Sequence, residues 1–325
     1  MQNLRRRDLL ASVAAICLTP LASTARAQSY PAGPVKVIVP YAPGAATDNL
    51  ARLLSQALEG PIGATFIVEN RAGGGTQIGT KAVASAAPDG QTLGFIDTAF
   101  VINPGLFGST LPYDTRRDFA PVSLMATAPL VLIAHSSVGV KDLKAFIELA
   151  KAQPGRLAYG SAGVGSAPHL AGEQLRRAAG IDINHAAYRG GSTVLNDLIG
   201  GHIQCGFTTV PTMVEHIRAG TVVALAVTAK SGQLPQLPTF GELGLPAVDT
   251  TPLFGMIAPA QTPAPVLQKL SQAASGAVAS GPLRARLTEL GFAPVGSSAD
   301  AFKARIDSEI AKWTEVIKAG NIKPS

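Results

Sequence analysis

The 325-residue sequence is poor in charge, in cysteine and in aromatic side chains. Asp, Glu, Lys and Arg make up 15% of it and hydrophobic residues 46%, whereas an average soluble protein has about 25% charged residues. This composition excludes an intrinsically disordered chain and allows a large core. Aromatic residues are only 5%, which leaves few side chains for stacking on nucleic-acid bases. The length indicates two lobes, since a domain usually holds about 100–200 residues.

Positive charge is concentrated at the N-terminus. The formal net charge is +6, and residues 1–27 carry four Arg against one Asp, which leaves 6 − 3 = +3 for the remainder. That excess is too small for a phosphate-binding stripe, so we expect no nucleic-acid partner. Arg5–Arg7, the apolar run 9–18 and Ala25-Arg26-Ala27 follow the order of a cleavable secretory signal, which predicts export and cleavage after residue 27. The arginines suit either an ordinary or a twin-arginine signal.

Signatures of catalysis, metal binding and disulfide bonding are largely missing. Signal cleavage would remove Cys17 and leave Cys205 as the one thiol, which we interpret as a buried residue of a short apolar strand. The sequence lacks a complete nucleophile elbow, a phosphate loop and a dinucleotide fingerprint, and its five His lack zinc-site spacing. We therefore expect no catalytic residue, no metal and no cofactor.

Short β-branched runs alternate with helical patterns along the mature chain, which predicts an α/β fold with largely parallel sheets. The pattern begins with strand 35–39 and helix 48–58 and restarts with strand 130–134, in keeping with two lobes. The segment 231–265 contains seven prolines and is interpreted as connection rather than core. A last helix over about 298–319 carries an apolar stripe that should pack on a lobe, formed by Phe302, Ile306, Ile310, Trp313 and Ile317.

Small residues precede four of the predicted helices, at 41–48, 69–76, 160–166 and 188–193. In a parallel α/β sheet such loops lie at the carboxyl ends of the strands, where ligands bind. The N–H groups and the positive dipole end of a helix start favour an anion such as a carboxylate. Each hydrogen bond to a charged group contributes roughly 1.5–3 kcal/mol, so several together can hold a carboxylate without arginine. Alternatively, the glycines serve only tight turns and caps.

Short motifs follow one another along the mature chain, among them Val68-Glu69-Asn70-Arg71, Ala87-Pro88-Asp89-Gly90, Leu111-Pro112-Tyr113-Asp114, His169-Leu170-Ala171-Gly172-Glu173 and Tyr188-Arg189-Gly190-Gly191. Together they resemble the Bug family, the periplasmic solute receptors of tripartite tricarboxylate transporters. The resemblance implies a two-lobed Venus-flytrap receptor of the type II-like kind that closes on a small carboxylated solute. It also implies that 28–127 plus 250–325 form the first lobe and 128–249 the second.

The resemblance implies a solute site made by all four loops. The expected ligand-binding residues are Tyr41, Gly44, Ala45, Ala46 and Asp48 in the first loop, Gly74, Gly75, Thr76 and Gln77 in the second, Ser161, Gly165 and Ser166 in the third, and Gly190 and Ser192 in the fourth. A capping role is the alternative for Asp48. Arg71 and Arg189 are candidates for pairing with a carboxylate, with solvated or structural roles as the alternative. Ala45 stands where the family commonly has a second Gly, which narrows the first loop.

We therefore expect a monomeric periplasmic receptor without catalysis, whose partners are a small carboxylate and the subunits of a membrane transporter. Dicarboxylates, tricarboxylates, acidic amino acids and aromatic acids are all compatible with recognition by backbone amides. Two other functions stay open at this point. One is a sensory co-receptor that presents its solute to a membrane kinase, and the other is a secreted hydrolase that uses Ser161 as its nucleophile.

Overall fold

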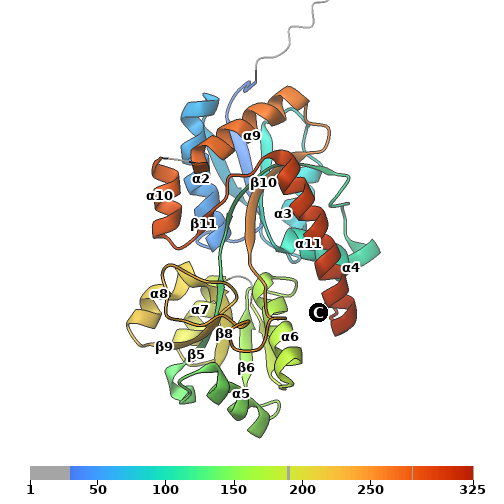
Figure 1. Ribbon diagram of the computed structural model, residues 1–325. Helices are drawn as coiled ribbons and strands as arrows, with labels where there is room; N and C mark the ends of the chain where they lie inside the picture. The colour runs from blue at the N-terminus through green and yellow to red at the C-terminus, as the bar shows by residue number, and fades with distance from the viewer. Residues whose placement is uncertain (1–29, 189–190, 280, 325) are drawn as a thin grey trace, which may run out of the picture.

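The computed structural model describes residues 30–188, 191–279 and 281–324. The predicted signal peptide, Arg189 and Gly190 therefore lie outside the described residues. The chain forms two lobes, each built on its own sheet and covered by helices (Figure 1). Within the described ranges, no helix combines the length and apolarity needed to cross a bilayer.

The first lobe contains a six-stranded sheet in the order β11-β4-β10-β3-β1-β2. Its strands are β1 (Val35–Val39), β2 (Phe66–Asn70), β3 (Thr92–Asp97), β4 (Phe119–Thr127), β10 (Leu253–Pro259) and β11 (Ala293–Pro294). Strand β1 pairs in parallel with β2 and β3, whereas β10 is antiparallel to β3 and β4. The helices are α2 (Ala46–Ile62), α3 (Gln77–Ala84), α4 (Ala99–Phe107), α9 (Ala264–Ala279), α10 (Pro282–Glu289) and α11 (Ala299–Gly320), and a 3₁₀ turn covers Gly108–Thr110.

The second lobe contains a five-stranded sheet in the order β7-β6-β8-β5-β9. Its strands are β5 (Leu130–His135), β6 (Ala158–Ser161), β7 (Asn184–Ala187), β8 (Cys205–Thr209) and β9 (Val222–Val227). Strand β6 pairs in parallel with β7 and β8, whereas β5 is antiparallel to β8 and β9. The helices are α5 (Leu143–Ala152), α6 (Ala167–Ala179), α7 (Gly191–Ile199) and α8 (Val210–Arg218), and a 3₁₀ turn covers Ser136–Val138.

Both sheets are mixed, which corrects the expectation of largely parallel sheets, while the two-lobed α/β fold is confirmed. The central antiparallel strands are β5 and β10, and each is the first strand after the chain has crossed from the other lobe. A crossover helix on the same sheet makes the next strand parallel. A strand that follows a crossing from the other lobe can enter the sheet in either direction, because no crossover helix of that sheet precedes it.

The interpretation of 231–265 as connection is wrong for the seven residues of β10. All seven are buried, and β10 lies between β3 and β4 in the first sheet. Pro252 precedes the strand and Pro259 is its last residue, so neither proline removes a donor from its interior. Proline content therefore misled the prediction, because the prolines flank the strand.

The chain crosses between the sheets twice, once between β4 and β5 and once between β9 and β10. The two crossings lie side by side, since the N–H of Ala128 donates to the carbonyl of Pro252 at 3.0 Å. The lobe boundaries proposed at 127/128 and 249/250 stay a prediction.

Two predictions about the core are confirmed. All five residues of the C-terminal stripe are buried, and α11 runs along one side of the first lobe, next to α4 (Figure 1). Cys205 is fully buried in β8, and burial raises the pKa of its thiol to about 12. A thiol with that pKa stays protonated at neutral pH, which argues against a nucleophilic role.

Candidate functional site

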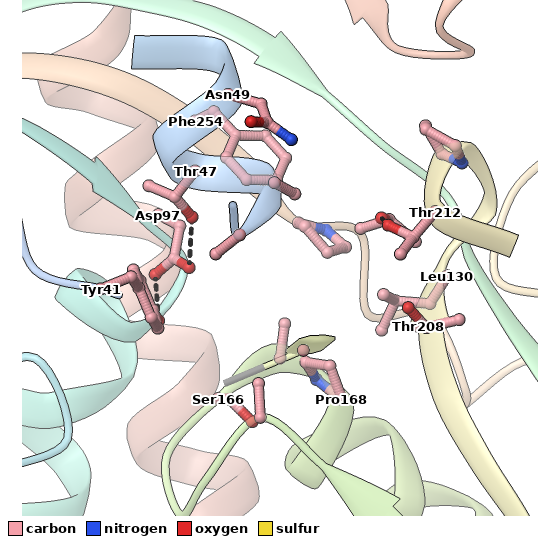
Figure 2. A pocket seen from close by; sticks show the side chains of 18 of the residues that line it. Tyr41, Thr47, Asn49, Asp97, Leu130, Ser166, Pro168, Thr208, Thr212 and Phe254 are labelled. Atoms are coloured by element: carbon pink, nitrogen blue, oxygen red, sulfur yellow. Dashed lines mark hydrogen bonds between the residues drawn. The ribbon is translucent and has the colours of Figure 1, made fainter. Parts of the chain in front are cut away.

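Two adjoining cavities are lined by residues of both lobes. The first has a volume of about 240 Å³ and is shown in Figure 2, and the second has a volume of about 620 Å³. They share three lining residues, Tyr41, Ala162 and Ser166. We call the first the apolar cavity, because aliphatic, aromatic and proline side chains predominate in its wall, and the second the loop cavity, because the residues 72–77 and 162–164 form most of its wall.

The structure brings nine of the fourteen predicted residues to these cavities. The apolar cavity is lined by Tyr41, Gly44, Ala45, Ala46 and Ser166, and the loop cavity by Tyr41, Gly74, Gly75, Thr76, Gln77 and Ser166. Asp48, Ser161 and Gly165 are absent from both linings. Gly190 lies outside the described residues, and Ser192 is in the first turn of α7 with its side chain outside the description. Contact of any of these residues with a solute stays a prediction.

Three first-lobe helices, α2, α3 and α4, start at the cavities, and none is capped by the side chain of its N-cap residue, although Asp97 accepts the N–H of Ala99 at the start of α4. The N-cap of α2 is Ala45, which has no polar side chain, and the N-cap of α3 is Thr76, whose hydroxyl makes no capping bond. In contrast, Ser166 caps α6 and Ser298 caps α11 with their hydroxyls. A helix start leaves backbone N–H groups without intrahelical partners. The start of α2 therefore directs hydrogen-bond donors and its positive dipole end toward the apolar cavity. At the start of α3 the N–H groups of Gln77 and Ile78 donate to the carbonyls of Gly74 and Gly73 at 3.2 and 3.5 Å, so this helix contributes its dipole to the loop cavity.

The second loop is held in a strained conformation by Asn103. Thr76 has a φ of 76°, in the left-handed region that residues other than glycine seldom adopt. The amide of Asn103, fully buried in α4, donates to the carbonyl of Gly75 at 2.9 Å and to the hydroxyl of Thr76 at 3.1 Å. Our sequence analysis missed this residue, whose only local signal is a polar side chain within an apolar helix.

Asp48 supports the first loop from behind. Its buried carboxylate accepts hydrogen bonds from the N–H of Gly44 at 2.9 Å, from the amide of Asn70 at 2.8 Å and from Arg52 at 3.0 Å. Burial raises the pKa of Asp48, but the hydrogen bonds from these partners and the charge of Arg52 lower it by more, so the net shift of the pKa is downward. This arrangement gives Asp48 a structural role, although the N–H that it accepts belongs to Gly44, the residue before the N-cap of α2. Arg71, one of the two arginines considered as partners of a carboxylate, pairs with Glu69 on the surface and lines neither cavity.

The third loop lies on two stacked histidines. The rings of His169 and His185 are 4.2 Å apart, and Ser161 Oγ is 2.7 Å from His185 Nε2. The N–H of Gly165 donates to His169 Nδ1 at 3.2 Å, which requires that nitrogen to be unprotonated. Ser161 is fully buried and also bonds to Gly163, so a substrate in either cavity cannot reach it. The arrangement gives Ser161 a role in shaping the loop rather than in nucleophilic attack.

The histidine pair predicts that the protein loses stability in mild acid. The pKa of each imidazole is lowered from 6.5 to about 4, mainly because the ring is buried. The negative charge of Glu173 raises the pKa of both rings, and the positive charge of Arg176 lowers it. Between pH 6.5 and 4 the unfolded chain binds more protons than the folded chain, so the free energy of unfolding falls as the pH falls. At pH 5.5 we expect a loss of about 1 kcal/mol for each histidine relative to pH 7.5.

Urea denaturation at pH 7.5 and 5.5 measures this loss. The double variant His169→Asn/His185→Asn, which cannot titrate at these positions, should show a smaller drop between the two pH values. An equal drop in both proteins would show that other groups cause the acid sensitivity.

Asp97, at the carboxyl end of β3, is a cavity residue that our sequence analysis missed. Its Oδ1 accepts from the Tyr41 hydroxyl at 3.0 Å and from the N–H of Ala99 at 2.9 Å, and its Oδ2 accepts from the Thr47 hydroxyl at 3.2 Å (Figure 2). Burial raises the pKa of Asp97, and these hydrogen bonds only partly counter it. The sequence signal that could have identified Asp97 is an acidic residue at the end of an otherwise apolar strand.

Comparison with known proteins assigns the chain to a family. A sequence profile described as the tripartite tricarboxylate transporter family receptor matches residues 50–322. The chain belongs to this receptor family. The predicted resemblance to Bug proteins is also confirmed, since the structure is similar to that of the periplasmic binding protein BugD, with 31% identity, a TM-score of 0.85, and coverage of 91% of this chain and all of that one.

Two further similar structures contain carboxylates. The Rhodopseudomonas palustris protein Rpa4515, solved with adipate, has 31% identity and a TM-score of 0.87, and the match covers 91% of this chain and 100% of that one. MatC of the same organism, solved with bound malate, has 30% identity and a TM-score of 0.83, with coverage of 89% and 100%. This receptor thus has the fold of periplasmic solute-binding proteins.

Proposed function

We propose that the protein is a periplasmic receptor that captures a small carboxylate between its lobes and delivers it to a tripartite tricarboxylate-type membrane transporter. The observation that carries the proposal is that α2 and α3, which have no side-chain cap, begin at cavities lined by both lobes and point their positive dipole ends toward them. Adipate and malate in the related structures support a carboxylate as the solute.

Gly74, Gly75 and the side chain of Gln77 in the first lobe and the backbone of Ala162 and Val164 in the second hold the carboxylate in the loop cavity. The hydroxyl of Ser166 lines this cavity but donates to the carbonyl of Gly163 at 2.6 Å. The lobes approach each other there, because a Cβ on Gly75 would lie 3.6 Å from the carbonyl oxygen of Val164. Only in the closed arrangement do both lobes contribute hydrogen-bond donors to the solute. Binding of the solute therefore shifts the population of protein molecules toward the closed arrangement. The protein acts without catalysis, since the candidate nucleophile Ser161 is buried behind the loop.

A thermal-shift screen of the exported protein, refolded from denaturant to remove carried ligand, tests the proposal. The panel holds aliphatic, amino and aromatic carboxylates, each paired with its neutral amide. A carboxylate at 100 times its dissociation constant stabilises the fold by roughly 2.7 kcal/mol, which raises the melting temperature measurably. We expect a shift with at least one carboxylate and none with its amide. Equal shifts for acid and amide, or no shift with any acid, would contradict the proposal.

A further inference from the structure

Among the described residues that line it, the apolar cavity has no cationic side chain that would pair with a second carboxylate; its donors, such as Asn49, Thr208 and the start of α2, are neutral. Among the described residues that line either cavity, Asp97 is the only charged side chain. Aliphatic and aromatic side chains, among them Leu130, Val194, Phe207 and Phe254, form much of the wall around it. Moving a carboxylate from water into such a wall costs several kcal/mol unless a cation or hydrogen-bond donors pair with it. The Asp97 carboxylate adds like-charge repulsion to that cost.

Asp97 has capacity to accept one more hydrogen bond. The donors from Tyr41 and Ala99 both reach Oδ1, whereas among the other described residues the Thr47 hydroxyl is the one donor to Oδ2; the N–H of Asp97 itself also faces its own carboxylate. A carboxylate oxygen has two acceptor positions. The side chain is partly exposed and lines the cavity. Its free position therefore suits an N–H or O–H group of a molecule in the apolar cavity.

From this geometry we infer that the solute is a monocarboxylate with an apolar body that carries a hydrogen-bond donor, above all an ammonium group, at its far end. The inference rests on the proposed function, because the carboxylate end occupies the loop cavity. The apolar cavity covers the body by hydrophobic contact. Asp97 then acts as a specificity residue that favours an amino group and rejects a second carboxylate.

Ligands matched in length test the inference. Adipate, hexanoate and 6-aminohexanoate share a six-carbon chain with one carboxylate and differ only at the other end, and terephthalate, 4-methylbenzoate and 4-(aminomethyl)benzoate form the equivalent aromatic set. Titration calorimetry on the refolded, exported protein should give at least one amino acid of these sets a dissociation constant about tenfold or more below that of its dicarboxylate partner. The monocarboxylate without a donor should fall between the two.

Asp97→Asn separates a specificity role from a structural one. The amide keeps the size of the side chain and can donate to a carboxylate, so the preference for the amino ligand over the dicarboxylate should shrink about tenfold. A purely structural role would weaken all three ligands equally and keep their ratio. Asp142→Asn is the matched control, because this residue caps α5 and lies outside both linings. If Asp97→Asn fails to fold, the ratios of the dissociation constants measured on the unchanged protein still test the inference.

Failure of this inference can be distinguished from failure of the proposed function. A dicarboxylate that binds more tightly than its amino partner would overturn the inference while supporting the carboxylate receptor. The same holds if no member of either set binds but a dicarboxylate or a donor-free carboxylate of the broader screen does. If the amide 6-aminohexanamide binds as tightly as 6-aminohexanoate, the carboxylate is not recognised and the proposed function itself fails.

Discussion

Substitution of Gly165 by alanine should lower the affinity for the solute about tenfold to hundredfold without unfolding either lobe. Gly165 lies in the second lobe, and a Cβ built on it would lie 2.8 Å from Leu106 Cδ2 and 3.2 Å from Asn103 Oδ1, both on α4 of the first lobe. Contacts below 3.0 Å force atoms to move, and overpacking of this kind typically costs 1–3 kcal/mol. The cost falls on the closed arrangement, because only there do the two lobes meet.

The matched control is Gly139→Ala in the same lobe. Gly139 has a φ of 74° and Gly165 a φ of 78°, so alanine meets similar backbone strain at both positions. A Cβ on Gly139 would find no atom within 4 Å. The two variants should therefore lose similar stability, while only Gly165→Ala loses affinity.

Titration calorimetry with the solute found in the screen gives the dissociation constants, and small-angle X-ray scattering shows whether saturating solute still compacts the protein. Gly165→Ala should compact less than the unchanged protein. Equal affinities for Gly165→Ala and Gly139→Ala would show that the lobes do not need this close approach to bind the solute.

The sequence predicts the loops of the site well, because the residues that identify each loop are neighbours in the chain. A strand, a short run of small residues and a helix follow one another within about a dozen residues, and this order alone places Ala45 and Gly74–Gln77 at the ends of parallel strands. The same logic does not reveal Asn103, which reaches the second loop from a different helix across 28 residues of sequence. Side chains that support a loop from elsewhere in the chain leave no periodic signal.

The predicted contact residues that miss the cavities show the same limit. A carboxylate in the first turn of a helix is compatible with facing the cavity or the loop behind it, and hydrogen bonds from Gly44, Asn70 and Arg52 decide the orientation of Asp48. Ser161 likewise turns toward His185 on the neighbouring strand rather than toward the cavity. Orientation of a side chain at a loop depends on tertiary partners, which no pattern of spacing specifies.

Truncation of Trp313 to alanine should lower the free energy of unfolding by about 3–5 kcal/mol, more than any other substitution proposed here. The indole is almost fully buried in the stripe of α11 that covers the first lobe, and its Nε1–H donates to the buried Glu309 at 2.7 Å. Removing the ring leaves a cavity in the core and a carboxylate oxygen without this donor. Urea denaturation followed by circular dichroism measures the loss, since the chain has only one tryptophan and the variant has no indole fluorescence.

Two further variants separate packing from charge at this position. Trp313→Phe keeps most of the apolar contact and should lose clearly less stability than Trp313→Ala. Lys312→Ala removes the ammonium group that lies 4.9 Å from the centre of the indole ring and pairs with Asp249, and an exposed pair of this kind is worth at most about 1 kcal/mol. A Trp313→Ala loss no larger than that of Lys312→Ala would mean that the first-lobe core does not depend on α11. Because α11 packs on α4, which carries Asn103, the second loop would then be held without support from the C-terminal helix.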